Sequence, residues 1–119
     1  MIEVRLCTKL DIVDIYNILF SYDKIGGMDL KETIEEFEKR FTDNVATFGY
    51  FVDGTLTSFL ITKKLIEIPS WYVLMISSKN SKKFNFKESG FANLFDSAVE
   101  YWEKQFVFSF MLILSLIHI

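Results

Sequence analysis

Six residues with the sequence KESGFA, at positions 87–92, are the first candidate for chemistry in this chain. They place Gly90 and Ala92 at the start of a segment whose apolar residues recur at helical spacing. The first N–H groups of a helix lack internal acceptors, and the helix dipole makes that end positive. Since glycine has no side chain and alanine only a methyl group, we expect an anion such as a phosphate to approach these amides closely. The hexapeptide alone is a weak signal, because most glycines at helix starts serve only the turn.

The elements expected around this turn are an apolar strand before it and an amphipathic helix after it. Residues 71–76, WYVLMI, are apolar on both faces, as in a strand buried in the middle of a sheet. Residues 77–86 are polar and basic and are predicted to form a loop. The helix expected over residues 87–105 has one apolar face, formed by Phe91, Leu94, Phe95, Ala98, Val99 and Trp102. Residues 106–112 are almost wholly apolar, and we predict a further buried strand there.

The beginning of the chain predicts one strand and two helices. Residues 2–7 alternate in polarity as a short strand does, and Thr8 has the look of a helix N-cap with Asp11 three residues on. A first amphipathic helix follows, and the pair Gly26-Gly27 ends it. Asp29 then caps a second helix, whose apolar stripe is Leu30, Ile34, Phe37 and Phe41.

The middle of the chain predicts antiparallel strands. The dipeptide Asp53-Gly54 supplies the two positive-φ positions of a tight hairpin turn between strands at 47–52 and 55–61. A second reversal at 63–70 contains the only proline, Pro69. The predicted order is β-α-α-β-β-β-α-β, and only the last strand can be parallel to its neighbour, because that crossover needs a helix. The fold class is therefore α+β, with a mixed, mostly antiparallel sheet and flanking helices.

Composition limits the class of protein. With 119 residues the chain forms one domain at most, and 50% apolar residues with 13 Phe argue for a dense core. The net charge of −3 does not indicate a basic surface for nucleic acid, so no nucleic acid is expected as a partner. The single cysteine, Cys7, cannot form an internal disulfide and is expected to be a small buried hydrophobe in a reducing, cytoplasmic compartment. No signal peptide is visible, and the abundance of Lys, Asn, Ile and Phe fits an AT-rich microbial or viral genome.

The apolar C-terminal run, residues 106–119, is shorter than the roughly 20 residues of a membrane span, so no membrane is expected as a partner. Its end, LSLIHI at 114–119, resembles the translation of a transposase end sequence used in sequencing libraries. We therefore expect the chain to stop matching its gene near Ile113, with the true C-terminal part missing and residues 114–119 forming a non-native tail. His118, the only histidine, then has no catalytic role.

The order of elements resembles the GNAT N-acetyltransferase superfamily. In that family a strand, two helices and three antiparallel strands precede a helix that opens on a glycine-containing turn, and a parallel strand follows. The family signature at the turn is Gln or Arg, two residues, Gly, one residue, and then Gly or Ala. Here Gly90 and Ala92 match, while Lys87 replaces Gln or Arg. The resemblance covers residues 2–113 and depends on element order more than on residue identity.

The resemblance implies an acyl-CoA-dependent N-acyltransferase that moves an acetyl or other acyl group from CoA to an unidentified amine. In the family, the amides of the turn hold the pyrophosphate of acetyl-CoA, and the pantetheine arm lies between two splayed strands. Carried over to this chain, nine residues are expected to bind the co-substrate: Met75, Ile76, Ser77, Lys87, Glu88, Ser89, Gly90, Phe91 and Ala92. Lys87 keeps a cation beside the phosphates. Lys82 and Lys83 either attract the phosphates as well or are ordinary solvated lysines of the loop.

The chain departs from the family pattern in two places. About ten residues, 77–86, separate the strand from the signature, so either the strand runs on into Ser78 or the loop is an insertion. Beyond Ile113 the family has another helix and two more strands, which often supply a tyrosine general acid and one wall of the acceptor pocket. We therefore expect a partial acyltransferase domain over residues 1–113, with an incomplete acceptor site.

The implied reaction needs a group that accepts the proton of the attacking amine, and the catalytic residues stay unassigned. Glu67 is the best placed carboxylate by sequence, although a charged residue in an exposed turn is the simpler interpretation. Tyr50 and Tyr72 lie on predicted strands and either line the acceptor groove or pack in the core. Residues 22–28 correspond to a loop that closes over the acceptor in the family.

A second hypothesis is a non-catalytic GNAT-shaped interaction domain, with the basic loop at 77–86 as its contact surface. A purely structural α+β domain is the remaining alternative. Binding of CoA distinguishes the enzyme from both.

Overall fold

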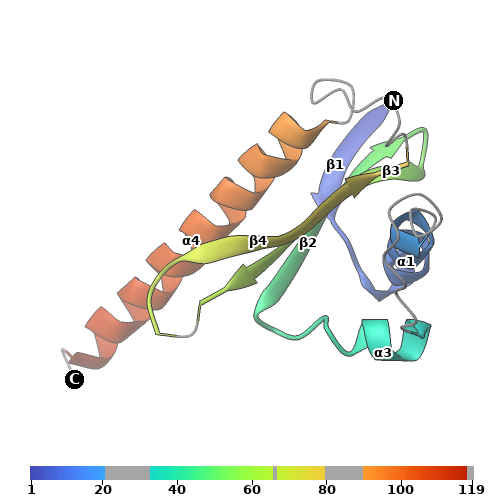
Figure 1. The fold of residues 1–119 in the computed structure, drawn as a ribbon. Coiled ribbons are helices and arrows are strands. Elements are labelled where there is room, and N and C mark those ends of the chain that lie inside the picture. Colours follow the sequence, from blue (N-terminus) through green and yellow to red (C-terminus); the bar gives the residue numbers. More distant parts are fainter. Residues whose placement is uncertain (21–32, 66, 80–89, 118–119) are drawn as a thin grey trace.

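The structure is a computed structural model, and it describes residues 1–20, 33–65, 67–79 and 90–117. A single sheet lies between two layers of helices, as Figure 1 shows: a long helix crosses one face, and short helices lie on the other. Asp29, Gly26-Gly27, residues 22–28 and the lysines at 82, 83 and 87 lie outside the described residues, as do Glu88, Ser89 and His118.

The sheet has four antiparallel strands in the order β1-β2-β3-β4. Their bounds are β1 (Ile2–Leu6), β2 (Val45–Val52), β3 (Thr55–Lys64) and β4 (Trp71–Ser78). The predicted hairpin turn is confirmed, because Asp53 and Gly54 join β2 to β3 with φ values of 52° and 83°. The second reversal is also present, and Leu65 N donates to Ser70 O at 2.9 Å to close it.

The first helical layer contains a 3₁₀ turn, η1 (Lys9–Asp11), and the helices α1 (Ile12–Phe20) and α3 (Ile34–Glu38). Thr8 and Asp11 form the predicted capping box, which starts the turn that leads into α1. The N-cap of α3 is Thr33, whose hydroxyl accepts from Glu36 N. The core on this face joins buried side chains of these helices to β2 and β3: Ile12, Ile15, Ile18, Phe37, Phe51, Leu56, Phe59 and Ile61.

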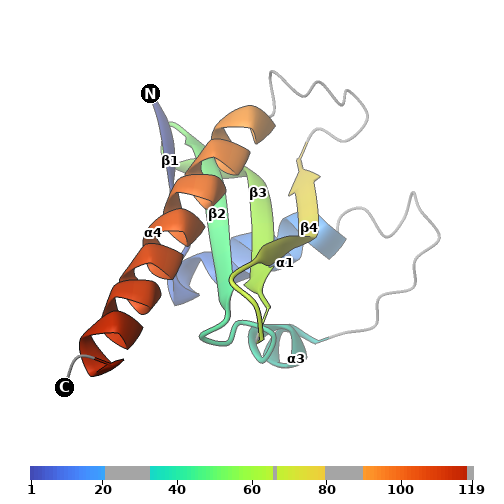
Figure 2. The same ribbon diagram turned by 90° about the vertical axis from the view of Figure 1, so that its left-hand side faces the viewer.

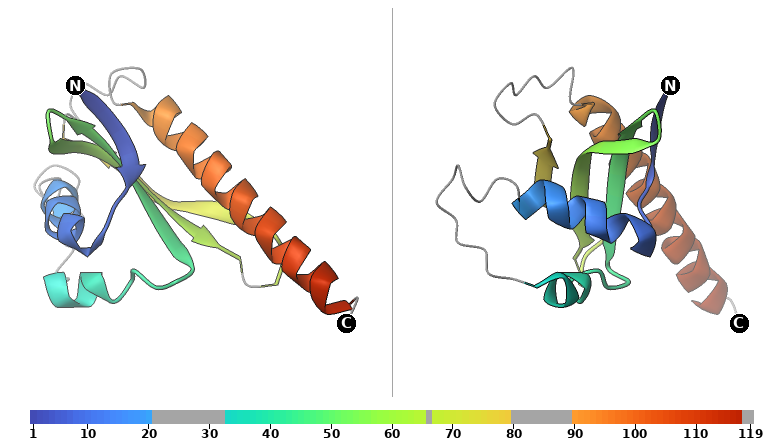
Figure 3. Two further views of the ribbon diagram at one scale, coloured as in Figure 1. Left: turned by 180° about the vertical axis from the view of Figure 1, so that it is seen from behind. Right: turned by 90° about the vertical axis from the view of Figure 1, so that its right-hand side faces the viewer.

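The second layer is one helix, α4 (Phe91–Ile117), which runs diagonally across the opposite face of the sheet (Figures 2 and 3). Phe91, Leu94, Ala98 and Trp102 are buried at the helical spacing that the sequence predicts. Val99, predicted on the same face, is instead 40% exposed, because it lies at the margin of that face. Together with the facing strand residues, the buried helix residues form the second core: Ala46, Phe48, Tyr50, Leu60, Phe91, Leu94, Ala98 and Trp102.

The strand predicted at residues 106–112 is wrong, because α4 continues without a break to Ile117. A short apolar run is compatible with a buried strand or with a buried helix, and periodicity alone does not separate them. Here no glycine or proline stands between the amphipathic part of the helix and the apolar run, so nothing ends the helix.

The buried central position predicted for residues 71–76 is also wrong. Within the described ranges, β4 is an edge strand, and Tyr72, Val73 and Leu74 are 37–46% exposed. The two errors have one cause, since the strand expected to pair with the outer edge of β4 is part of α4 instead. The α+β class and the antiparallel strands are confirmed, whereas the parallel pair is not present among the described residues.

The molecule is elongated, with a radius of gyration of 16.2 Å and extents of 56 × 32 × 23 Å. A compact chain of this length has a radius of gyration of about 13–14 Å. The helix α4 contributes to this length, because its 27 residues span about 40 Å and extend beyond the sheet at the C-terminal end (Figure 1). Within the described part of the chain, no helix combines the length and the apolar character needed to cross a bilayer.

Candidate functional site

The start of α4 has the backbone geometry that the glycine signature predicts. Gly90 has a φ of 70°, in the left-handed region, and its carbonyl accepts the first helical hydrogen bond, from Leu94 N at 3.0 Å. The amides of Ala92 and Asn93 precede Leu94 and therefore have no acceptor inside the helix. Phe91 is buried in the core, while Ala92 is exposed. This end of α4 thus presents backbone donors at the positive end of a 27-residue helix.

Tyr50 of β2 explains why this position must be glycine. A Cβ atom built at Gly90 would overlap the Tyr50 ring, and the positive φ would strain any L side chain there. Tyr50 is itself only 7% exposed and belongs to the core beneath α4. Of the two interpretations left open for Tyr50, core packing is the one that the structure favours. The missing side chain at Gly90 therefore lets the helix start close to the sheet.

The end of β4 lies at the same end of the sheet as the start of α4. Tyr50 pairs with Ser58 of β3, and Ser58 pairs with Ser78 of β4, so these three residues form one row across the sheet. Neighbouring strands are about 4.8 Å apart, which separates Tyr50 from Ser78 by about 10 Å. Lys79 N continues the pairing by donating to Thr57 O at 2.9 Å. The strand therefore extends to Ser78, which is the first of the two alternatives given for the residues between the strand and the signature.

The predicted pantetheine-binding residues Met75, Ile76 and Ser77 lie in β4, just before this row, and all three are half-buried. Since β4 pairs only with β3 among the described strands, the backbone groups on its outer edge have no strand partner there. Six of the residues predicted to bind the co-substrate are described by the structure, and they lie toward one end of the sheet. They are Gly90, Phe91 and Ala92 of the helix start and Met75, Ile76 and Ser77 of β4.

A β-bulge in β4 is a feature that the sequence does not predict. Ile61 pairs with Met75 and Thr62 pairs with Val73, so Leu74 is an extra residue on β4. A bulge takes one residue out of the ladder and re-aims its side chain, and bulges are common beside active sites. Nothing in an unbroken apolar run marks such a position, because a bulge depends on how two strands pair.

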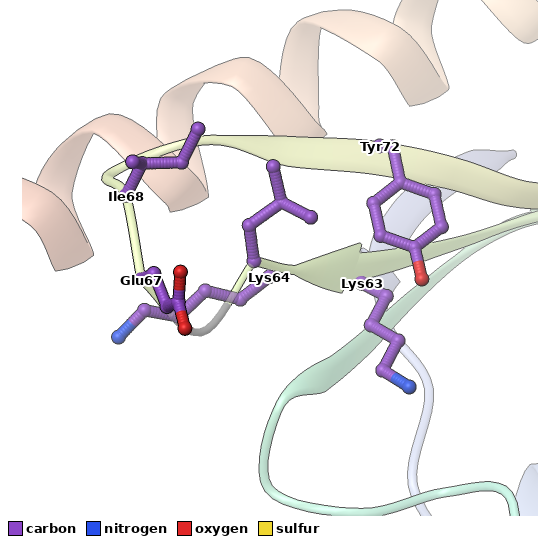
Figure 4. Close-up of a pocket in the computed structure, with 6 residues that line it drawn as sticks. Lys63, Lys64, Glu67, Ile68 and Tyr72 are labelled. Atoms are coloured by element: carbon purple, nitrogen blue, oxygen red, sulfur yellow. The ribbon is translucent and has the colours of Figure 1, made fainter.

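A cavity of about 490 Å³ lies at the turn between β3 and β4, at the opposite end of β4 from α4's start. Figure 4 shows the side chains that line it, from both strands and the turn: Lys63, Lys64, Leu65, Glu67, Ile68 and Tyr72. Glu67, the candidate proton acceptor, is exposed and lines this cavity together with Tyr72. The turn is fixed by the bond from Leu65 N to Ser70 O and by Ser70 N, which donates to Ile68 O at 2.7 Å.

A smaller cavity of about 80 Å³ lies between α3 and the sheet. It is lined by Phe37, Arg40, Phe41, Val45, Ile61, Leu74 and Met75. It therefore adjoins the bulge on the face of β4 opposite α4, and its walls are mostly apolar.

Among the described residues, the side chains with shifted pKa values lie outside both cavities, where β1 meets η1. Arg5 binds the Asp11 carboxylate through two nitrogens, at 2.9 and 3.2 Å, and Thr8 N donates to the same carboxylate at 2.8 Å. Burial alone would raise the pKa of Asp11, but the hydrogen bonds from Arg5 and Thr8 outweigh it and hold the pKa below its usual value. Burial also raises the pKa of Cys7 to about 12, which favours the thiol over the reactive thiolate at neutral pH.

Solved structures resemble this chain in fold although the sequences are distant. A probable acetyltransferase from Staphylococcus epidermidis matches 90% of this chain and 69% of its own, with a TM-score of 0.68 and 17% identity. An aminoglycoside acetyltransferase from an uncultured soil metagenomic sample, solved with sisomicin, matches 87% of this chain and 71% of its own (TM-score 0.66, 11% identity). The PaiA N-acetyltransferase from Thermoplasma acidophilum, solved with coenzyme A, matches 88% and 74% (TM-score 0.63, 17% identity). No protein-family model and no curated protein sequence matches the chain.

The fold is α+β, and a long helix starts near the end of an edge strand. More specifically, the chain has the fold of the GNAT N-acetyltransferases, as the resemblance in its sequence implied.

Proposed function

We propose that this chain is an acyl-CoA-dependent N-acyltransferase domain that transfers an acetyl or other acyl group from CoA to an amine. The observation that carries the proposal is the pairing of two features at one end of the sheet. The amides of Ala92 and Asn93 stand at the start of α4, where Gly90 packs against Tyr50. The end of β4 at Ser78 lies about 10 Å from Tyr50 across the sheet. The same fold in a protein solved with coenzyme A supports this assignment.

The two features suit different parts of CoA. Amides at a helix start bind anions well, so the residues from Lys87 to Ala92 are proposed to hold the pyrophosphate. The pantetheine arm carries amide groups, which can pair with the backbone of an edge strand as another strand would. Met75, Ile76 and Ser77 are proposed to make those bonds.

In the proposed reaction, the amine nitrogen attacks the carbonyl carbon of the thioester. An N–C bond forms, the C–S bond breaks, and the sulfur leaves with the electron pair as CoA thiolate, which then takes a proton. The protein must align the two reactants and hold the developing oxyanion with a backbone N–H. The bulge at Leu74 is a suitable source for that donor, since it interrupts the ladder in the strand proposed to hold the thioester arm.

The ammonium form of the acceptor must lose a proton before it attacks, and a carboxylate accepts it directly or through water. Glu67 is the proposed acceptor, because it lines the larger cavity beside β4. The acid that protonates the thiolate stays unassigned.

Isothermal titration of the chain with CoA tests the proposal. We expect a dissociation constant in the micromolar-to-millimolar range for the unaltered chain. The variant Ala92→Glu places a carboxylate at the proposed phosphate site, and it should fold normally because Ala92 is exposed and acidic residues suit the first turn of a helix. It should therefore lose CoA binding, whereas the neutral control Ala92→Gln should keep most of it. No heat with the unaltered chain, or equal affinity of the two variants, would refute the proposal.

A further inference from the structure

We propose that the cavity at the turn between β3 and β4 binds an amine that also carries an anionic group, a carboxylate or a phosphate. The cavity volume of about 490 Å³ falls in the usual range for small-molecule sites, about 300–1,000 Å³. The proposal concerns the acceptor and depends on the proposed transferase function for the reaction, but not for binding.

The polar side chains of this cavity have no polar side-chain partners in the described part of the chain. For Lys63, Lys64, Glu67 and Tyr72, no salt bridge or side-chain hydrogen bond is formed with any residue that the structure describes. Figure 4 shows them arranged around one opening: Lys63 lies beside the Tyr72 ring, and Glu67 is in the turn near Lys64. Lys63 and Tyr72 are also direct neighbours across the two strands. A ligand can therefore bind these groups without breaking existing contacts.

The signs of the charges define the ligand. Two ammonium groups and one carboxylate line the cavity. A simple amine would satisfy Glu67 but would face two like charges, and a simple anion would satisfy the lysines but would face a carboxylate. A molecule with both groups pairs its ammonium with Glu67 and its anion with Lys63 or Lys64. Leu65, Ile68 and the Tyr72 ring supply the apolar walls.

The position of the cavity fits an acceptor site. Tyr72 lies in the cavity, and Met75 on the same strand begins the segment proposed for the CoA arm. The two are three residues apart, about 10 Å along a strand, and the bulged residue Leu74 lies between them. An amine bound beside Tyr72 would therefore approach the bulge from the end opposite to the phosphates, and Glu67, which lines the same cavity, would accept its proton.

Amide NMR spectra of the ¹⁵N-labelled chain test this proposal with three probes of matched shape. L-phenylalanine carries an amine and a carboxylate, phenethylamine carries only the amine, and 3-phenylpropionate carries only the carboxylate. We expect L-phenylalanine to shift the amide signals of Lys64, Leu65 and Tyr72 in a saturable manner. The other two probes should bind about tenfold more weakly, since each lacks one charge-assisted hydrogen bond.

Two variants separate the charges. The double variant Lys63→Gln/Lys64→Gln should erase the advantage of L-phenylalanine over phenethylamine, and Glu67→Gln should erase its advantage over 3-phenylpropionate. Lys39→Gln, which removes an exposed lysine of the α3 C-cap, should change neither. Equal affinity for the three probes, or shifts confined to other parts of the molecule, would overturn the proposal.

A CoA titration on the same sample keeps the two proposals apart. If CoA binds but the probes are not discriminated, the acceptor assignment fails and the transferase function stands. If the probes are discriminated but CoA gives no heat, the cavity stands as a binding site and the transferase function fails.

Discussion

At the scale of single residues, Gly90 carries two separate requirements. Its φ of 70° is unfavourable for residues with a side chain, and the space where a Cβ would lie is taken by the Tyr50 ring. Gly54 shares the first requirement, with a φ of 83°, but nothing lies within 4 Å of its Cβ position. The two glycines therefore form a natural pair for separating backbone strain from steric overlap.

Gly90→Ala should lower the free energy of unfolding by about 2–4 kcal/mol, because it adds overpacking to the cost of a left-handed backbone. Gly54→Ala should cost only the backbone part, about 1–2 kcal/mol. Urea denaturation of the two variants measures the difference. Equal losses of unfolding free energy in the two variants would show that moving the Tyr50 ring costs nothing. That result would contradict the tight packing of Tyr50 against Gly90.

Asp11 should make the stability of the chain sensitive to acid. Its pKa is lower in the folded chain than in the unfolded chain, so the stabilisation is complete at neutral pH and is lost as the pH falls below about 4. Asp11→Asn should cost about 1–3 kcal/mol at pH 7 and should flatten the fall in stability between pH 5 and pH 3, estimated from the usual range for carboxylates. Thermal unfolding at several pH values measures this.

The matched control for Asp11 is Asp43→Asn, which alters an exposed carboxylate in the turn before β2. It should leave both the stability at pH 7 and the acid dependence nearly unchanged. If the stability of Asp11→Asn still falls between pH 5 and pH 3 as in the unaltered chain, another group causes that fall.

At the scale of elements, α4 is joined to the sheet by a buried polar link. Trp102 Nε1 donates to Thr62 Oγ1 at 2.9 Å, and the Thr62 hydroxyl donates to Ala46 O at 2.7 Å. Trp102 is 3% exposed and Thr62 is fully buried, so neither group has water as an alternative partner. The link fixes where α4 lies on β3, and with it the position of the helix start.

Thr62→Val should destabilise the chain by about 1–3 kcal/mol, because it leaves the Trp102 N–H buried without an acceptor. Thr47→Val is the matched substitution, since the Thr47 hydroxyl is buried and has no hydrogen-bond partner among the residues that the structure describes. Thr47→Val should therefore be neutral or stabilise by up to about 1 kcal/mol. Urea denaturation followed by tryptophan fluorescence compares them, and a larger loss from Thr47→Val would contradict the described bonding.

The elements that local chemistry specifies were predictable from the sequence. The turn at Asp53 and Gly54 needs positive φ values, and the Thr8 capping box needs one hydroxyl and one carboxylate at fixed spacing, so both could be recognised. Whether residues 106–112 form a helix or a strand depends on whether a neighbouring strand is available for pairing. No local sequence pattern shows this. The edge position of β4 and the bulge at Leu74 follow from the same non-local pairing.

At the scale of the whole molecule, the candidate site lies along β4, with one proposed binding feature near each end. The helix start at Gly90 lies near the C-terminal end of β4, across the row of Tyr50, Ser58 and Ser78. The cavity with Glu67 lies near its N-terminal end. The sequence predicted the first feature, because a glycine ahead of an amphipathic helix is a local signal. It named Glu67 but not Lys63 and Lys64 beside it, because the cavity forms only when the turn closes.

The measurement that tests the account most directly is the position of CoA on the molecule. Amide NMR spectra of the ¹⁵N-labelled chain, recorded during a titration with CoA, report which backbone groups the ligand contacts. We predict that the largest shifts fall on Gly90, Ala92 and Asn93 at the start of α4 and on Ile76 and Ser77 of β4. Saturable binding with shifts confined to α1, α3 or the outer turn of β2 and β3 would contradict the proposed site, as would an unchanged spectrum.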